Sequence, residues 1–387
     1  MATLIFHDNL IWSLANNRGG HAMSNLQWLH GLERLGHRIL FIDYLEDYSQ
    51  PAVSAFQRII CEWWHPDQCA LILTRSTESL YGLSTGQVRR FAAEADALIT
   101  LNVPCNREPL PLLEQVRPRI LVDRDPGFTQ LWVTETGQDA TDIYGEQDLY
   151  FTFGGNIGSP RCSVSTLGIC WLPTYNPVIL NWWLPREEIT HNRFTTVAGW
   201  WEGGYYLLEG RVVGPKSEQW RKFIDLPKRI GESVEIALEI EPDDPDISYL
   251  QDHGWRVQSP KVVGSPALYR DYVCASAGEF SCAKGVYVET QCGWFSDRSA
   301  CYLAAGRPVV VQATGFERLL PTGKGLFAVT TVEEAAEAIK AIRRDYGTHS
   351  AAARAIAAEY FDSDKLLSRL LAEADIRSAS SSGRTSS

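Results

Sequence analysis

Apolar positions in the first half of the chain alternate between short runs typical of strands and spacings typical of helices. Thr3–His7 predicts a short apolar strand, and Gly20–Leu35 repeats leucine along one side of a helix. Further short apolar runs predict buried strands at Arg38–Tyr44, Ala70–Leu73, Ala97–Leu101, Arg119–Val122 and Leu149–Thr152, with helical stretches at 52–61, 84–94 and 108–116. A repeated strand-then-helix order predicts an α/β fold, with a parallel sheet that binds ligands beyond the carboxyl ends of its strands.

The alternation of predicted strands and helices is interrupted at Pro173–His191, a segment with three prolines and no helical or strand periodicity. A second series of strands and helices follows it. Apolar runs in this series predict strands at Phe194–Gly199, Val234–Leu238, Arg256–Val257, Val273–Ala275 and Val309–Gln312, and the closing helices at Thr331–Arg344, 350–360 and 363–373. The pattern indicates two α/β domains, 1–180 and 192–376, joined by the proline-rich crossing. The serine-rich tail 377–387 has the composition of a disordered segment.

The most informative stretch is Gly293–Val310, with the sequence GWFSDRSACYLAAGRPVV. It predicts a loop, a helix of about two turns, a Gly-Arg-Pro corner and a buried strand. Ser296 or Asp297 can cap the helix, because a short side-chain oxygen accepts from an otherwise unpaired backbone N–H. Gly306 suits the left-handed position that ends a helix. A helix that starts from a glycine-containing loop is a natural phosphate site, which places Ser296, Asp297 and their neighbours among candidate anion ligands.

The ending LAAGRPVV resembles the donor-side signature of glycosyltransferases with the GT-B fold, and the loop that follows, with Thr314 and Gly315, is similar to their sugar-contacting loop. The resemblance implies two Rossmann-like domains facing across a cleft. It also implies a hexosyltransferase-like activity that needs neither a cofactor nor a metal, with a nucleotide-sugar donor held by the second domain. One position departs from the pattern, because Cys301 stands where many such enzymes have a ribose-binding glutamate. Either Asp297 or Ser299 takes over the ribose hydroxyls, or the nucleotide is held differently.

Further donor-side candidates come from the second half of the chain. The family commonly uses an Arg and a Lys five residues apart to neutralise the leaving diphosphate, a spacing that Arg211 and Lys216 match, with Lys216 at a helix start as the better candidate. A solvated surface pair is the alternative. Glu279 could accept from ribose hydroxyls, and Lys284 could supply charge to a phosphate. Arg298 could make a bidentate hydrogen bond to a phosphate or form an ion pair inside the cleft.

On the acceptor side, the sequence NNRGGH lies between the first strand and the first long helix. Gly19 and Gly20 would let the backbone come close to a ligand, and a simple turn explains them equally well. His21 is a candidate general base because its unperturbed pKa lies near neutrality. A capping or packed histidine is the alternative.

Two acidic residues follow the predicted strand at 119–122. Asp123 could deprotonate an acceptor hydroxyl or hold its sugar ring. The structural alternative pairs Asp123 with Arg124 and makes Asp125 a helix cap. Asn156, in the glycine-rich loop FGGNIG, could bond to a sugar or base or simply occupy a tight turn.

Composition narrows the class of partner. Of 387 residues, 45% are hydrophobic and 21% charged, which is typical of globular proteins, and the net charge of −11 argues against nucleic acid as partner. No apolar run is long enough to cross a membrane and no leader is evident, so we expect a cytoplasmic protein whose nine unpaired-looking cysteines are free thiols. The function indicated is transfer of a sugar from a nucleotide-sugar to an acceptor hydroxyl. A sugar-nucleotide epimerase of the same fold and a non-catalytic sugar-nucleotide or glycan-binding relative are the alternatives.

Overall fold

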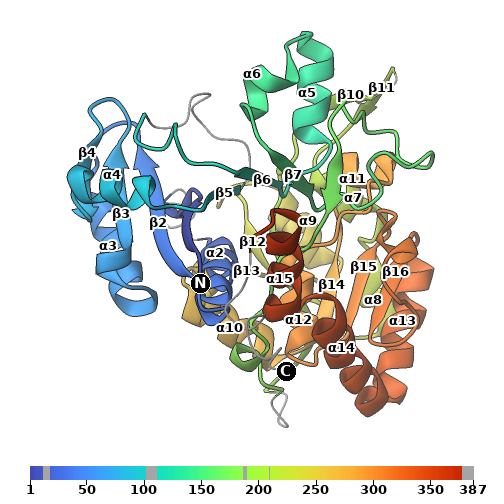
Figure 1. The fold of residues 1–387 in the computed structure, drawn as a ribbon. Helices are drawn as coiled ribbons and strands as arrows, with labels where there is room; N and C mark the ends of the chain where they lie inside the picture. Colours follow the sequence, from blue (N-terminus) through green and yellow to red (C-terminus); the bar gives the residue numbers. More distant parts are fainter. Residues whose placement is uncertain (12–17, 102–110, 186–189, 209, 377–387) are drawn as a thin grey trace, which may run out of the picture.

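The protein consists of two α/β halves, each built on its own sheet (Figure 1). The computed structural model describes residues 1–11, 18–101, 111–185, 190–208 and 210–376. The predicted disordered tail 377–387 lies outside the described residues. So do parts of the NNRGGH loop, of the proline-rich crossing and of the predicted helix 108–116.

The first sheet has eight strands in the order β4-β3-β2-β1-β5-β6-β7-β8. All neighbouring pairs are parallel except β3 with the edge strand β4. The strands are β1 (Thr3–His7), β2 (Arg38–Leu45), β3 (Cys69–Leu73), β4 (Glu78–Gly82), β5 (Ala97–Leu101), β6 (Arg119–Asp123), β7 (Leu149–Thr152) and β8 (Trp171–Pro173). The order reverses at β1, so the carboxyl end of this strand, at His7, lies at the point where such sheets bind ligands.

The second sheet has six strands, all parallel, in the order β13-β12-β9-β14-β15-β16. They are β9 (His191–Gly199), β12 (Glu235–Glu239), β13 (Arg256–Gln258), β14 (Ser276–Ser281), β15 (Val309–Gln312) and β16 (Leu326–Val329). Here the order reverses at β9. A two-stranded hairpin of β10 (Tyr206–Leu208) and β11 (Arg211–Val213) follows β9 and was not foreseen from the sequence.

Helices flank the sheets. Those of the first series are α2 (Gly19–Arg34), α3 (Gln50–Trp63), α4 (Thr85–Ala93), α5 (Phe128–Thr136) and α6 (Ala140–Tyr144). Those that follow β9 are α7 (Lys216–Lys222), α8 (Leu226–Ile230), α9 (Asp246–Asp252), α10 (Pro266–Ala275), α11 (Gly285–Thr290), α12 (Asp297–Ala304), α13 (Val332–Arg344), α14 (Tyr346–Tyr360) and α15 (Ser363–Glu373). Short 3₁₀ turns occupy Pro66–Gln68, Leu180–Trp182, Pro260–Val263 and Phe316–Arg318.

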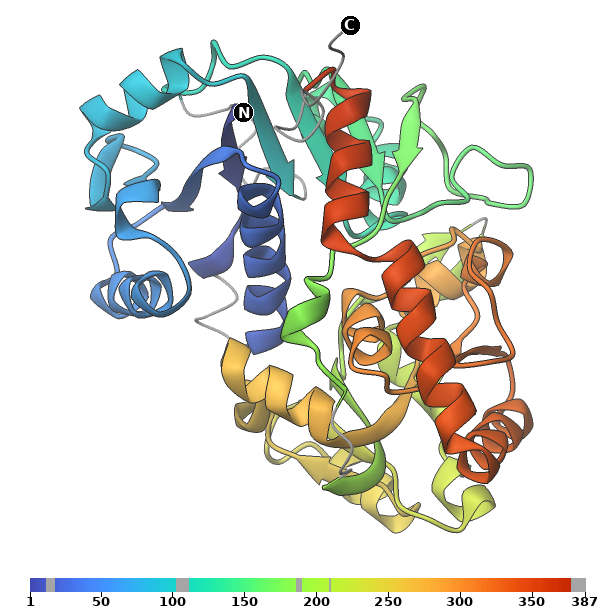
Figure 2. The same cartoon turned by 60° about the horizontal axis from the view of Figure 1, so that its bottom comes forward.

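The last helix of the chain returns to the first half. Leu367, Leu370 and Leu371 of α15 are buried in the same apolar core as the leucines of α2. Figure 2 shows α14 and α15 running from the second half toward the first. The domain limits assigned from sequence stay a prediction, but this packing means that both ends of the chain contribute to the first core.

The halves also meet directly where α2 begins. A Cβ added at Gly19 would lie 2.3 Å from the carbonyl oxygen of Val263 and 2.4 Å from that of Ser265, and one at Gly20 would lie 3.0 Å from the Tyr269 ring. These glycines therefore let α2 approach the backbone before α10 in the second half. A simple turn, the alternative considered from the sequence, does not account for this close approach.

Several sequence predictions need correction. Val273–Ala275, predicted as a strand, ends α10, and the strand is the next segment, β14. The error has a physical cause, because β14 consists mostly of small and polar residues and therefore lacks the apolar run that marks a buried strand in the sequence. Close packing favours the small residue at Gly278, since an added Cβ would lie 2.6 Å from the Phe194 ring and 2.7 Å from a carbonyl oxygen. The described end of the predicted helix 108–116 forms turns instead.

Candidate active site

An open cavity lies between the start of α2 and the carboxyl ends of β9 and β12, with about 610 Å³ of empty space that is partly continuous with solvent. Its walls therefore come from both halves of the molecule. The lining residues are Arg18, Gly19, Gly20, His21, Val197, Ala198, Gly199, Glu202, Lys216, Ala237, Glu239, Pro260, Val263, Tyr269, Asp297 and Arg298. Six of the residues predicted from sequence come together here: Gly19, Gly20, His21, Lys216, Asp297 and Arg298.

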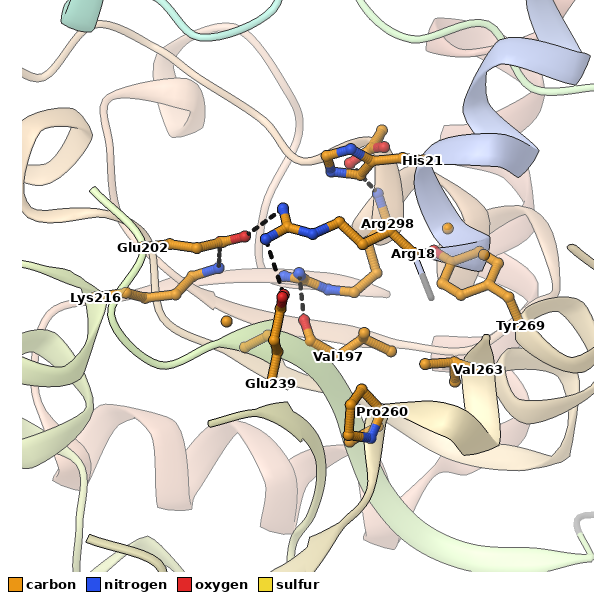
Figure 3. A pocket seen from close by; sticks show the side chains of 16 residues that line it. Arg18, His21, Val197, Glu202, Lys216, Glu239, Pro260, Val263, Tyr269 and Arg298 are labelled. Atoms are coloured by element: carbon orange, nitrogen blue, oxygen red, sulfur yellow. Dashed lines mark hydrogen bonds and ion pairs between the residues drawn. The ribbon is translucent and has the colours of Figure 1, made fainter. Parts of the chain in front are cut away.

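Two cations from opposite sides of the cavity converge on one carboxylate (Figure 3). Arg18, just before α2, places Nη1 3.0 Å from Oε1 of Glu202, and Lys216, the first residue of α7, places Nζ 3.3 Å from Oε2. Arg18 also reaches Glu239 at the end of β12, with Nη2 2.8 Å from Oε2. This cluster links the two halves across the cavity.

The cations set the charge states in this cluster. Burial acts to raise the pKa of Glu202, but Lys216, Lys284 and Arg18 outweigh it and hold that pKa at about 2. Burial lowers the pKa of Lys216, and the neighbouring Glu202 carboxylate opposes that shift. An ionised carboxylate therefore occupies the point where the two cations would otherwise face a ligand anion.

Arg298, in the first turn of α12, is held on three sides. Its Nε donates to Oε1 of Glu279 at 2.5 Å, Nη1 to the Val197 carbonyl at 2.8 Å and Nη2 to Oγ of Ser281 at 2.7 Å. Burial works to lower the pKa of Arg298, but the Glu279 carboxylate outweighs it and raises the pKa. Of the two predicted roles, the ion pair is the one that the structure shows. Glu279 itself is fully buried beneath Arg298, so it does not face the cavity.

His21 lies in the second position after Gly19, on the cavity side of α2 (Figure 3). The ring is accessible from the cavity, yet surrounding protein desolvates it and lowers its pKa, while Asp297 opposes that shift. A neutral imidazole at neutral pH can accept a proton, which is what a general base requires.

A second, smaller cavity with about 240 Å³ of empty space lies behind Arg298, at the carboxyl ends of β14 and β15. Ser296, Ser299 and Thr314 line it together with Arg298. Ser296 is the N-cap of α12, as predicted, and accepts from the Arg298 amide at 3.2 Å. The Thr314 hydroxyl donates to the Trp294 carbonyl at 2.5 Å. The buried Ser299 hydroxyl has no hydrogen-bond partner among the described residues.

Cys301 does not face either cavity. It is buried in α12, and Gln27 of α2 lies 3.7 Å from its sulfur atom through Nε2. The oxygen of the same Gln27 side chain accepts from the indole of Trp183 at 2.7 Å. The position that holds a ribose-binding glutamate in many GT-B enzymes is thus part of the seam between the two halves in this chain.

The acidic pair after β6 is placed differently from either expectation. Asp123 is buried, accepts from the Asp125 amide and from Gln130, each at 3.0 Å, and does not line the cavity. Burial raises its pKa to about 7. Asp125 is no helix cap: its Oδ1 lies 2.7 Å from Nζ of Lys284 and accepts from the Tyr287 hydroxyl.

These contacts change how three sequence candidates are interpreted. Lys284, predicted to face phosphate, ties the second half to Asp125. Arg124 bonds to Asp8 at 2.7 Å rather than to Asp123, which corrects the pairing considered from the sequence. The base role of Asp123 stays a prediction, and its burial does not favour it.

Gly315 and Asn156 belong to the seam beside the smaller cavity. Nδ2 of Asn156 donates to the carbonyls of Gln291 at 3.0 Å and Gly315 at 3.1 Å. Gly315 has a φ of +94°, and an added Cβ would lie 2.5 Å from Nδ2 of Asn156. Both residues therefore fix loops from the two halves against each other, and Gly315 lines neither of the two cavities.

Sequence reasoning missed Arg18, Glu202 and Glu239. Arg18 lies inside the NNRGGH motif, where the adjacent glycines are the stronger signal. Glu239 directly follows a predicted strand, and this position could have identified it. Glu202 lies in a loop that no pattern distinguished. Arg211 is exposed on β11 and does not line the cavity, so only Lys216 of that predicted pair does.

Within the described residues, no group of three or more His, Cys, Asp or Glu side chains is arranged to hold a metal ion. The predicted independence of metals and cofactors stays a prediction. None of the helices in the described ranges combines the length and apolar character needed to span a membrane.

Comparison with known proteins gives matches at the level of structure. No protein-family model matches the chain, and no curated protein sequence does. An α-glucosyltransferase solved with UDP and a 13-mer DNA is 12% identical, with a TM-score of 0.62 over 96% of this chain and 99% of that one. HepE of Anabaena, solved with UDP-glucose, is 15% identical, with a TM-score of 0.59 over 96% of this chain and 100% of that one.

These similarities cover almost the whole of every chain compared, so they concern the arrangement of both halves and not one Rossmann-like unit alone. The chain therefore has the GT-B fold, with two Rossmann-like halves that face each other across a cleft.

Proposed function

We propose that the protein is a glycosyltransferase that moves a hexose from a nucleotide-sugar, a UDP-sugar in the first instance, to an acceptor hydroxyl. The observation that carries this proposal is the convergence of Arg18 and Lys216 on Glu202, at the carboxyl ends of the second sheet. Two cations held there by different halves suit a diphosphate, because each can neutralise one phosphate group. The structural neighbours solved with UDP or UDP-glucose support the choice of nucleotide.

In the donor-bound state, the diphosphate replaces the Glu202 carboxylate as partner of Arg18 and Lys216. The acceptor oxygen attacks the anomeric carbon, the bond from that carbon to the diphosphate oxygen breaks, and His21 takes the hydroxyl proton. Charge builds on the departing diphosphate, and Lys216 and Arg18 stabilise it as it forms. Closure of the two halves excludes water that would hydrolyse the donor.

The charge of the chain bears on the class of acceptor. One neighbour was solved with DNA, but the net charge of −11 of this chain favours an acceptor other than nucleic acid. We place the reaction in the reducing cytoplasm, supported by the eight described cysteines, which form no disulfide with one another and five of which are buried.

A panel of nucleotide-sugars and nucleoside diphosphates tests the proposal. Calorimetry with UDP should show binding, and Lys216→Ala should weaken it by about 10-fold or more, as expected for a charge-assisted bond. Lys228→Ala is the matched control, because Lys228 is exposed and outside the cavity. Arg298→Ala is a poor test, since it would leave the buried Glu279 carboxylate unpaired.

The products separate the candidate functions. Release of UDP together with a glycosylated acceptor supports the proposal. An epimerised sugar would identify an epimerase, and binding without turnover on any acceptor would indicate a non-catalytic protein. Absence of nucleotide binding by the intact chain would refute the glycosyltransferase, the epimerase and a sugar-nucleotide-binding protein alike.

A further inference from the structure

Glu239 stands out among the carboxylates of the cavity because it is the more open of the two that bind Arg18. Its side chain is 42% exposed, against 25% for Glu202. In the described part of the chain, its one ion pair is with Arg18 and uses Oε2. Glu202, in contrast, uses both oxygens, one for each cation. Glu239 therefore keeps acceptor capacity that faces the cavity.

The surroundings of Glu239 differ from those of Glu202. Pro260 and Val263 line the cavity to one side of Glu239, whereas Lys216 lies on the other side (Figure 3). The cavity thus passes from a cationic part to an apolar part, with Glu239 between them. A nucleoside diphosphate has the same order of chemistry: a charged diphosphate, a ribose with two hydroxyls and a flat base whose ring faces can lie against apolar side chains.

The other nearby carboxylates are engaged within the second half. Asp297 also lines the cavity, and its Oδ1 accepts from the Arg298 amide at 2.8 Å at the start of α12. Glu279 is buried against Arg298. Cys301, at the position of the family's usual ribose ligand, is buried in the seam.

We infer that Glu239 binds the ribose of the donor, with its carboxylate accepting hydrogen bonds from the 2′- and 3′-hydroxyls. The inference rests on the proposed function and adds a specificity-determining residue to it. An ionised carboxylate is an acceptor with two oxygens, which suits a vicinal diol. Once the hydroxyls satisfy Glu239, Arg18 is released from it and turns to the diphosphate. The base lies against Pro260 and Val263.

A carboxylate that accepts from a hydroxyl of the bound nucleotide disfavours a ligand that lacks this hydroxyl, because the bound ligand covers the carboxylate and leaves it without that partner. The intact protein should therefore bind UDP at least about 10-fold more tightly than 2′-deoxy-UDP, the lower limit for a hydrogen bond to a charged group. In Glu239→Gln the ratio should fall to about threefold or less, since a neutral amide oxygen accepts more weakly.

Two control variants isolate the effect. Glu241→Gln changes an exposed carboxylate two residues further on, outside the cavity, and should keep the full ratio. Lys216→Ala should weaken UDP and 2′-deoxy-UDP by the same factor, because it acts on the diphosphate. The comparison of the two ligands on the unaltered protein needs no variant to fold.

The outcomes are distinguishable. Equal affinity of the unaltered protein for both nucleotides overturns the assignment of Glu239 while leaving the proposed function intact. A ratio that Glu239→Gln retains overturns it as well. If neither nucleotide binds, the proposed function fails and this inference fails with it.

Discussion

The replacement of Gly19 by alanine is the sharpest test of how the two halves meet. The new Cβ would lie 2.3 Å from the Val263 oxygen, 2.4 Å from the Ser265 oxygen and 2.6 Å from the Ser265 carbonyl carbon. Ordinary contact begins at 3.4 Å, so the first of these distances is more than 1 Å too short. All three atoms belong to the backbone, which cannot turn away as a side chain can.

The only relief is a displacement of α2 from the segment before α10. Overpacking of this kind costs about 1–3 kcal/mol, and we expect a loss of that size in the free energy of unfolding. For a chain of this length, such a loss lowers Tm by a few degrees. Because Arg18 directly precedes Gly19 and reaches Glu202 across the cavity, the displacement should also weaken UDP binding about 10-fold or more.

Gly86→Ala provides the matched control. Gly86 lies in α4, and a Cβ there meets nothing within 4 Å. Alanine is favoured over glycine within a helix, so this variant should be neutral or stabilised by up to about 1 kcal/mol. The measurements are thermal and denaturant unfolding together with calorimetry. If Gly19→Ala has the same unfolding transition and the same affinity for UDP as the unaltered protein, the two halves do not make the direct contact at Gly19.

Three further predictions concern stability. Burial raises the pKa of Asp123 from 3.8 to about 7, so ionisation of this carboxyl opposes folding as the pH rises. Between pH 5 and pH 8, the free energy of unfolding of the unaltered protein should therefore fall by about 2 kcal/mol relative to that of Asp123→Asn, as measured by denaturant unfolding. A difference between the two proteins that does not change with pH would contradict the raised pKa. Asn156→Ala should cost about 1–3 kcal/mol, since it leaves the carbonyls of Gln291 and Gly315 without their amide donor, and an unchanged unfolding curve would show that this seam adds nothing. A chain that ends at Ile376 should keep its Tm in a thermal scan, because Ile376 is the last of the described residues that pack in the first core, and a fall of several degrees would mean that the tail contributes.

The sequence by itself determined the fold class and most of the elements. Period-two and period-3.6 apolar patterns depend on burial of one face, and that requirement is local, so β1, β5, β7 and α15 appear at their predicted residues. The helix start at Ser296 and its end at Gly306 were also readable, because capping and left-handed geometry involve only neighbouring residues.

Only the tertiary structure decided which candidates face the cavity. Lys284 and Arg298 look alike as cations in the sequence, yet each is bound to a carboxylate contributed by a distant segment, Asp125 and Glu279. The glycines of the NNRGGH motif were predicted to let the backbone approach a ligand, and the structure shows that Gly19 also admits the backbone of the other half. Ion pairs and close approaches of this kind join residues far apart in the chain. Their partners are fixed by the packing of the two sheets and the helices between them, which no local pattern encodes.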